Sequence, residues 1–546
     1  MTHPYDPNAG RNMSMSAAGS LMREGKRLGR LGLSPRQQEM NHLWSYYMCA
    51  QYAERRVDWD GSDYMSHTEK VAVASGKMMA NGFYDANGQA APLKFRRPTA
   101  PYHLCKVIVD RFTSLLFSEK RHPKISVEAD PVTEDFAETV AEEGRLWPTM
   151  MQARTFGGAT GSVAVGFQFL NGRPYFEVHD PRWVFPYFAD RSTLELGALE
   201  KRYVFFQEVY DPEAEKYVEV PFWYRRVIDH ERDIIFKPAP VGDGNEPEWE
   251  VERGVEHGFG FCPVQWIQNL PVVGDIDGLS DCHGTYDMME SVDCLQSQAQ
   301  RGVIANCDPT LIISSEAEMD SVKTGSAQAI RIPNGSVSYL ELSGSGPKSA
   351  RELAQEYRQQ ILEVNQCFLE GDQQAGGAMT ATEVERRYSS MLAKADVLRE
   401  QYGERGVKPL LRKVLAAVRQ LQNGKATTEG ITRYVLNLPP KVIAPANGSA
   451  ARVQERKLGM GPYNASLNWP RYFEPSLADI QQAVTAAASA KAGLLVDEEH
   501  ASKFVQEYFQ IEDLGKMLKG LKEKQAELDA AMMGGFGGQG DAGDFG

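Results

Sequence analysis

Residues 281–305 read DCHGTYDMMESVDCLQSQAQRGVIA and open the most informative part of the chain. Apolar side chains recur there every three or four residues, as on one face of an amphipathic helix; they are Tyr286, Met289, Val292, Leu295, Ala299 and Val303. A helix of this length would extend about 37 Å. Residues 349–370, SARELAQEYRQQILEVNQCFLE, repeat the pattern with Leu353, Tyr357, Ile361, Val364 and Phe368 on one face. The sequence therefore predicts two long helices.

The segment between these helices has the pattern of a small β structure. One apolar run is Leu311-Ile312-Ile313. A second run begins with Ile330 and Ile332, passes the turn Pro333-Asn334-Gly335, and continues with Val337 and Tyr339. Strands this short do not form a stable sheet by themselves. We expect them to be shared with another polypeptide.

A short loop and a third helix follow the second helix. The loop, residues 372–379, reads DQQAGGAM and has no charged residue after Asp372. Its two glycines permit backbone conformations that other residues avoid. Thr380-Ala381-Thr382-Glu383 is a capping box, which predicts that a helix begins there. Gly403, Gly406 and Pro409 should kink this helix before it continues to about residue 421.

Upstream, residues 162–236 predict a β-rich block within a helical chain. Val163, Val165, Phe167 and Phe169 alternate with smaller or polar residues, which is the two-residue period of a strand. Asn171-Gly172 follows and favours a tight hairpin. Further strand patterns occupy 202–209, 217–228 and 232–236, and helices are expected at 101–117 and near 477–491.

The composition is that of a soluble globular protein with several domains. The 546 residues carry a formal net charge of −14. Proteins that wrap nucleic acid for affinity are usually basic, so this chain would repel DNA at long range. It could still surround DNA, provided that the DNA slides and is not held. The seven cysteines form no C-x-x-C pair, which favours reduced thiols in a cytoplasmic compartment. We expect no signal peptide and no membrane span.

No motif predicts catalysis. The Gly-rich stretch at 157–162 lacks the lysine of a phosphate-binding loop and precedes a strand pattern, so a tight turn is expected there. Asp281-Cys282-His283 is not completed by a second cluster, and Asp281 is predicted to cap the following helix. The histidines at 103, 179, 230 and 257 are isolated and are expected to be packed or on the surface. We predict no catalytic residues, no metal site and no cofactor, and hence no enzyme.

The order of segments from 257 to 421 resembles the portal proteins of tailed bacteriophages. Residues 257–264, HGFGFCPV, followed by Asn269, resemble the portal segment that leads into the first long helix. The later order of helix, small β module, helix, Gly-containing loop and kinked helix is similar to the portal stem, clip, second stem helix, tunnel loop and spine helix. Residues 107–112 (VIVDRF), 123–125 (PKI) and 467–470 (LNWP) resemble parts of the portal wing.

The resemblance implies an α+β portal fold with a mixed α/β wing. The implied parts are a flexible tail (1–25), wing (26–278), first stem helix (279–306), clip (307–346), second stem helix (347–371), tunnel loop (372–379), kinked spine helix (380–422), returning wing segment (423–475), short helical crown (476–533) and a Gly-rich tail (534–546).

It also implies the function. A portal protein forms a homo-oligomeric ring, usually of twelve subunits, at one vertex of a virion capsid, and it assembles in the host cytoplasm. Double-stranded DNA passes through the ring without sequence specificity during packaging and ejection. The implied partners are the large terminase subunit, the major capsid and scaffolding proteins, and head-completion or tail adaptor proteins; no membrane is involved.

Three sets of site residues follow from this resemblance. The tunnel loop would line the channel with Asp372, Gln373, Gln374, Ala375, Gly376, Gly377, Ala378 and Met379. The second stem helix would present to the channel or a neighbouring subunit Lys348, Arg351, Gln355, Arg358 and Gln359. The clip would contact neighbours or partners through Ile330, Ile332, Val337 and Tyr339. Two alternatives remain: another virion adaptor protein, or a hydrolase with a β-rich substrate domain.

Overall fold

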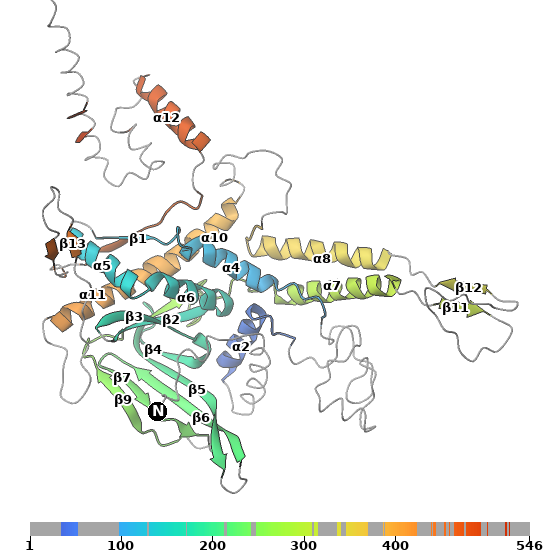
Figure 1. Ribbon diagram of the computed structural model, residues 1–546, viewed down its shortest axis with the longest axis horizontal. Coiled ribbons are helices and arrows are strands. Elements are labelled where there is room, and N and C mark those ends of the chain that lie inside the picture. Colours follow the sequence, from blue (N-terminus) through green and yellow to red (C-terminus); the bar gives the residue numbers. More distant parts are fainter. Residues whose placement is uncertain are drawn as a thin grey trace, which may run out of the picture. The chain divides into compact units, whose positions relative to one another are not determined.

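The computed structural model describes residues 34–52, 98–127, 130–170, 172–211, 216–241, 247–307, 311–314, 336–339, 345–369, 386 and 388–422, and then 438, 441–443, 452–454, 458, 463–473, 477–492, 500, 519–520 and 523–524. These residues form both helices and sheets, which confirms the predicted α+β class (Figure 1). Every strand pair among them is antiparallel.

The chain divides into two compact units. The first combines Met1–Phe368 with Ala393–Pro470 and contains every sheet of the described residues. The second combines Leu369–Leu392 with Arg471–Gly546. Its long helix is α12 (Leu477–Ala492), as predicted from the pattern at 477–491.

A three-stranded sheet lies at the centre of the first unit. Its middle strand is β2 (Ser162–Leu170), flanked by β3 (Arg173–His179) and β10 (Val264–Gln268). The turn after β2 is the hairpin predicted from Asn171-Gly172, and Gly172 has a φ of +80°. Both faces of β2 are buried, including Ala164 and Gly166 on the face opposite Val163 and Val165. The alternation in the sequence therefore reflects a difference in side-chain size between two covered faces of β2. It does not mark one face as exposed.

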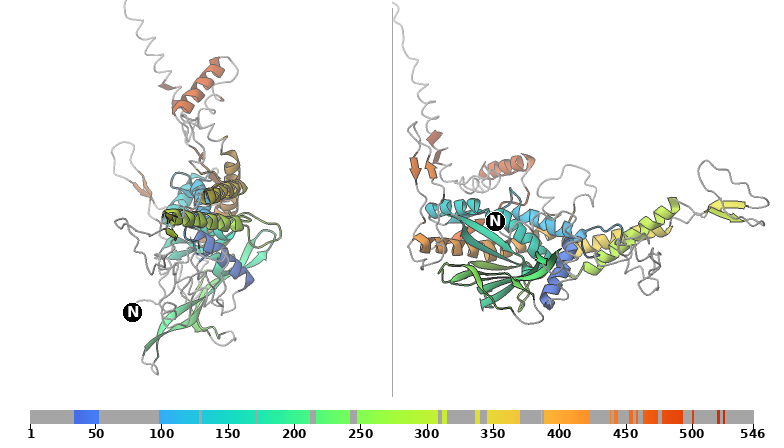
Figure 2. Two further views of the ribbon diagram at one scale, coloured as in Figure 1. Left: turned by 90° about the vertical axis from the view of Figure 1, so that its right-hand side faces the viewer. Right: turned by 60° about the horizontal axis from the view of Figure 1, so that its bottom comes forward.

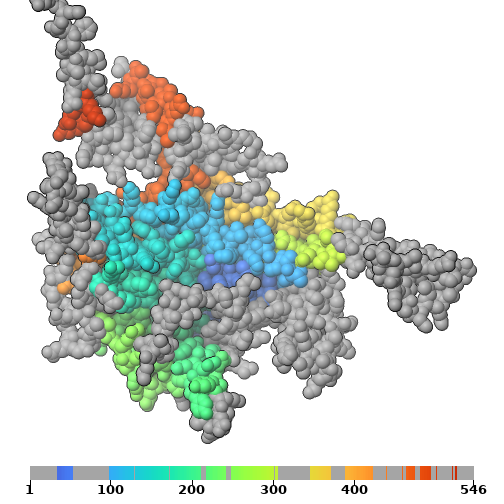
Figure 3. All heavy atoms as spheres, in the orientation of Figure 1, coloured from blue at the N-terminus to red at the C-terminus, as the bar shows by residue number. Residues whose placement is uncertain are grey.

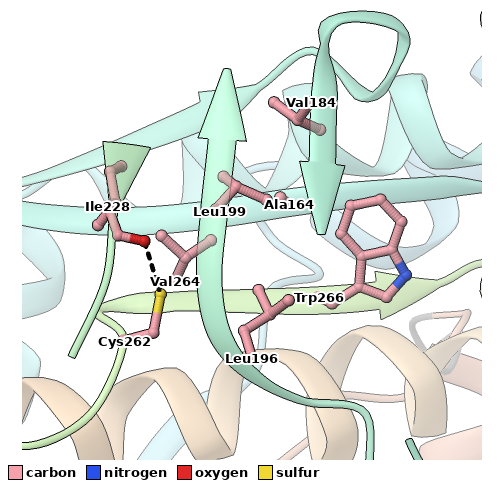
Figure 4. Packing of buried hydrophobic residues seen from close by; sticks show 8 residues of the cluster. All are labelled: Ala164, Val184, Leu196, Leu199, Ile228, Cys262, Val264 and Trp266. Atoms are coloured by element: carbon pink, nitrogen blue, oxygen red, sulfur yellow. Dashed lines mark hydrogen bonds between the residues drawn. The ribbon is translucent and has the colours of Figure 1, made fainter. Parts of the chain in front are cut away.

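A six-stranded sheet covers one face of this centre. Its strands are β4 (Val184–Asp190), β5 (Glu195–Asp211), β6 (Lys216–Ile228), β7 (Arg232–Phe236) and β9 (Val251–Glu256), and the short β8 (Ala239–Pro240) pairs with β6. The apolar contact between the two sheets is shown in Figure 4. It joins side chains of β2, of β10 and of the residues just before β10 with those of the larger sheet: Ala164, Cys262, Val264 and Trp266 with Val184, Leu196, Leu199 and Ile228.

Charged groups are also buried between the sheets. Arg226 on β6 pairs with Glu177 on β3 at 2.8 Å and with Asp233 on β7 at 2.8 Å. His179 lies beside them with 1% of its surface exposed, and burial lowers its pKa to about 4. Its Nδ1 is 3.8 Å from a Glu177 oxygen, too far for a hydrogen bond that would hold the proton. The imidazole is therefore neutral at neutral pH.

Helices pack on the other parts of the first unit. They are α2 (Pro35–Tyr47), α4 (Leu104–Phe117), α5 (Pro131–Glu143), α6 (Leu146–Thr160) and the 3-10 turn η3 (Pro181–Trp183). The capping box that opens α2 is formed by Ser34 and Gln37. The Gly-rich stretch at 157–162, predicted as a turn, is helical as far as Thr160. Only Gly161, with a φ of +95°, turns the chain into β2.

The third long helix is interrupted at the predicted glycines. It consists of α10 (Ser389–Arg399), the π-helical turn η4 (Glu400–Val407) and α11 (Lys408–Gln422). Both glycines of η4 are sites of close approach. A Cβ at Gly403 would lie 2.9 Å from Trp469 Cζ2, and one at Gly406 would lie 2.7 Å from Ile267 Cδ1. The π-helical turn ends two residues before Pro409, which has no amide hydrogen to donate.

Two further strand pairs join distant parts of the sequence. β1 (Lys124–Val127) pairs with β15 (Ala465–Asn468), so that Lys124 lies opposite Asn468. Leu467, in the segment that resembles a part of the portal wing, lies opposite Ile125 in this pair. β13 (Lys441–Ile443) pairs with β14 (Arg452–Gln454).

Candidate functional site

Two long helices of the first unit form an antiparallel hairpin. They are α7 (Tyr286–Cys307) and α8 (Ser345–Val364), which lie side by side in Figures 1 and 2. Between them in sequence, β11 (Leu311–Ser314) pairs with β12 (Ser336–Tyr339). The helices approach closely where Gly302 faces Pro347. A Cβ at Gly302 would lie 2.5 Å from Pro347 Cγ, so a side chain there would separate the helices.

At the base of the hairpin, the start of α7 and the end of α8 both differ from the prediction. α7 begins at Tyr286 and not near 279–281, because Gly284 has a φ of +80° and the preceding residues turn into the core. α8 ends at Val364, and Gln366 has a φ of +54°. Phe368 therefore lies outside the helix, and its predicted place on the apolar face of the helix is wrong.

Two acidic side chains of α7 attach the hairpin to residues upstream by accepting hydrogen bonds from them. Glu290 accepts a hydrogen bond from the Tyr46 hydroxyl at 2.9 Å. Asp293, only 3% exposed, accepts one from the Tyr52 hydroxyl at 2.6 Å and one from the backbone N–H of Tyr102 at 2.7 Å. Burial raises the pKa of Asp293. These bonds fix the side of α7 that faces α2.

The predicted basic and amide face of α8 also carries acidic side chains. Lys348, Arg351, Gln355 and Gln359 are exposed, and exposed acidic residues lie among them: Glu352, Glu356 and Glu363. Arg358 is half-buried. Its Nε donates to the Tyr102 hydroxyl at 3.1 Å, and its guanidinium carbon lies 5.6 Å from the centre of that ring. Whether the exposed members face a channel stays a prediction.

The apolar side chains of the hairpin are only partly covered. Met289 and Val292 on α7, and Ile361 on α8, are buried. Val303 and Ile304, near the end of α7 that precedes β11, are 53% and 56% exposed. On α8, Leu353 is 37% exposed, and Val364, the last residue of the helix at the base of the hairpin, is 62% exposed. The adjacent Val303 and Ile304 are therefore candidates for a contact with another chain.

A buried group of charged and polar side chains lies beneath the hairpin. It consists of Arg154, Asn269, Asp281, Asn365, Lys394 and Tyr402, and is called the base cluster below. Arg154 Nη2 and Asp281 Oδ2 form an ion pair at 2.7 Å with both side chains fully buried. Asn269 Nδ2 donates to the other Asp281 oxygen at 3.0 Å, and the Tyr402 hydroxyl donates to Asn269 at 3.1 Å. The predicted helix-capping role of Asp281 is therefore wrong.

Lys394 connects the base cluster to both ends of the hairpin. Its ammonium donates to the backbone oxygen of Asp281 at 3.2 Å and to that of Asn365 at 3.0 Å. Asn365 Nδ2 in turn donates to Thr285 Oγ1, just before α7, at 3.0 Å. Burial lowers the pKa of Lys394. The start of α7 and the end of α8 are thereby held by one lysine of α10.

The side chains next to Asp281 do not converge on a reactive group. Cys282 is fully buried, which raises the pKa of its thiol well above the usual value, whereas His283 is exposed. Within the described ranges, no group of three or more His, Cys, Asp or Glu side chains is placed to hold a metal ion. No helix of that part is long and apolar enough to cross a membrane.

Comparison with known proteins adds little. Neither a protein family nor a curated protein matches the sequence. Among solved structures, the chain is similar to a protein in the neck of a native GTA particle computed with C12 symmetry, at 11% identity and a TM-score of 0.31. That match covers 75% of this chain and 95% of the other. A likeness of this degree assigns no function.

Several predicted site residues lie outside the described residues. They are the whole tunnel loop, 372–379, and the clip residues Ile330 and Ile332. Val337 and Tyr339 lie in β12, opposite Ile313 and Leu311. The base cluster, in contrast, lies within the described residues. It was not predicted, because nothing in the sequence around Arg154 or Lys394 indicates that these charges are buried.

Proposed function

We propose that this chain is the subunit of a portal: a homo-oligomeric ring, with twelve copies, at one vertex of a virus capsid. Double-stranded DNA would pass through the ring during packaging and ejection. The packaging motor would dock on it first, and head-completion or tail proteins afterwards. The role is structural, and no catalytic step is assigned to the chain.

The α7–α8 hairpin with its exposed apolar side chains is the observation that supports this proposal. Four large apolar side chains, at 303, 304, 353 and 364, are between 37% and 62% exposed. In Figure 3 the atoms of the two helices form one continuous surface. Full burial of such a side chain contributes about 1.5–3 kcal/mol, so covering the exposed half of four contributes about 3–6 kcal/mol. A second copy of the hairpin is a fitting cover, since a ring repeats the same contact around an axis.

The order of elements and the charge agree with this function. A long helix, a small antiparallel pair, and a second long helix occur in the sequence order of the portal stem and clip. The net charge of −14 per subunit would make a ring repel phosphate overall. DNA in such a passage would slide and would not stop at one site.

Native mass measurement of the purified protein, together with negative-stain images, tests the proposal. We expect a closed ring with a central hole in the absence of DNA. Val303→Asp should raise the dissociation constant between subunits at least about tenfold, because it places a charge in an apolar contact. Val132→Asp is the matched control, since Val132 on α5 is 55% exposed against 53% for Val303. A monomer at all concentrations, or equal effects of the two substitutions, would contradict the proposal.

A further inference from the structure

The loop between β10 and α7, residues 270–279, ends in an apolar turn. The Asp275 N–H donates to the Val272 oxygen at 3.4 Å, and Gly274 between them has a φ of +90°, the positive value that a type II turn needs at its third residue. Val273 is the second residue of this turn, and its side chain is fully exposed. These four residues are called the knob below, because they present an apolar side chain to the surroundings.

Hydrogen bonds and an ion pair hold the loop of the knob in place. The side-chain amide of Gln268 donates to the backbone oxygens of Asp275 and Ile276, at 2.8 and 3.0 Å. Arg36 of α2 binds the Asp277 carboxylate through two hydrogen bonds, at 2.6 and 2.9 Å. A single exposed valine is common on protein surfaces. A valine on a braced turn is better suited to binding, because the contact then costs little conformational entropy.

A second apolar surface lies along α8. Leu353, Tyr357 and Val364 are spaced by four and seven residues, so they lie on one side of the helix. They are called the α8 stripe below. Tyr357 is half-buried, and the residues at the two ends of the stripe are 37% and 62% exposed. Apolar residues at this spacing are the pattern with which a helix receives side chains of a partner.

The knob and the lower end of the α8 stripe are both attached at the base of the hairpin, but on different sides. Lys394 donates to the backbone oxygens of Asp281, which follows the loop, and Asn365, which follows Val364. The loop itself is tied to α2 by Arg36. Figure 1 shows α2 on one side of α7 and α8 on the other. A closed ring needs two different surfaces of this kind, since each copy meets two neighbours.

We infer that the knob of one copy packs on the α8 stripe of the next copy in the ring. The inference rests on the proposed self-association and adds the knob to the parts of a neighbour that cover the hairpin. A second copy fits as the partner because both surfaces are apolar and both are exposed in the single chain. The contact is also continuous with the one proposed for the hairpin, since α8 belongs to both. Each copy would give its knob to one neighbour and its stripe to the other.

Site-specific photo-cross-linking of the full-length protein tests the contact directly. A diazirine-bearing leucine analogue replaces Val273, and equal amounts of ¹⁵N-labelled and unlabelled protein are mixed before assembly. After irradiation, mass spectrometry should find links from position 273 to residues 353–364, with pairs of mixed isotope content. Links of uniform isotope content only, or links only to other parts of the neighbour, would overturn the inference. An assembled ring without any such link would overturn it as well.

A charge exchange provides the second test. Val273→Asp and Val364→Lys should each raise the dissociation constant between subunits at least about tenfold, because either one places a charge in an apolar contact. The two together should recover most of the assembly, because opposite charges then meet. Val273→Asp with Val364→Asp should recover nothing. The matched control is Val251→Asp, since Val251 on β9 is 56% exposed and lies outside both surfaces.

The outcomes separate this inference from the proposed function. A ring that forms as readily in Val273→Asp as in the wild type overturns the inference and leaves the portal proposal standing. A wild-type chain that forms no ring overturns both. Weakened assembly of Val273→Asp that Val364→Lys does not recover would also overturn the inference, because the knob would then bind elsewhere. Recovery supports it, since a disturbed loop would not be repaired by a change on α8.

Discussion

The buried ion pair of the base cluster offers a quantitative prediction. Asp281→Asn removes the negative charge and leaves Arg154 buried as an uncompensated cation. Both side chains are fully buried, and the pair measures 2.7 Å. Removing one partner of such a pair costs about 3–5 kcal/mol. Because asparagine retains an oxygen that can accept from Arg154, we expect the lower end, about 3 kcal/mol.

Amide hydrogen exchange is the suitable assay, because a chain of several units need not unfold in one step. Peptides covering the first turns of α7 should exchange about a hundredfold faster in Asp281→Asn, which corresponds to about 3 kcal/mol. Replacing both charges, Arg154→Met with Asp281→Leu, should restore most of the protection because neither member of the ion pair is then left buried without the other. Glu363→Gln, on an exposed part of α8, is the control for the loss of one carboxylate. If the double variant exchanges as fast as Asp281→Asn, the ion pair is not what holds the hairpin base.

Two further predictions concern other buried positions. The pKa of His179 is about 4 in the folded chain and about 6.5 when unfolded, so the stability that the neutral imidazole contributes is present above pH 6.5 and is lost as the pH falls toward 4, by up to about 3 kcal/mol. Between pH 6.5 and 4, the urea midpoint of His179→Gln should therefore fall less steeply than that of the wild type, and equal slopes would assign the acid sensitivity to other groups. Gly403→Ala would place a Cβ 2.9 Å from Trp469 and should destabilise the protein by about 1–3 kcal/mol, whereas Gly346→Ala, where a Cβ meets nothing within 4 Å, should be neutral or stabilising in thermal unfolding. Equal melting temperatures of the two alanine variants would count against close packing of the π-helical turn.

The sequence predicted elements whose signals are local. The period of apolar residues located α7 and α8, and Asn171-Gly172 located the turn between β2 and β3, because these patterns depend on residues close in the chain. The ends of the long helices were less well predicted. At the base of the hairpin, Gly284 and Gln366 adopt positive φ values that depend on the packing of the base cluster. Tertiary contacts therefore set these boundaries.

The base cluster itself was beyond prediction from sequence. Arg154 and Asp281 are 127 residues apart, and Lys394 is 113 residues from Asp281. Each of these residues occurs in a stretch whose composition would equally suit an exposed helix or loop. Asp281 was interpreted as a helix cap because an acidic residue before an apolar periodic run usually has that role. Only the fold shows that it faces a buried arginine.

The pairing of β1 with β15 has a consequence for how the chain is made. The two strands are 340 residues apart where Ser466 donates to the backbone oxygen of Ser126. At about 5–20 residues per second, a ribosome needs roughly 20–70 s to reach the second strand after completing the first. Throughout that interval Ile125 and Val127 lack the strand that completes their sheet. The nascent first unit thus carries an open strand edge for most of its synthesis, which makes it a substrate for chaperones that bind extended apolar segments until the last strand is delivered.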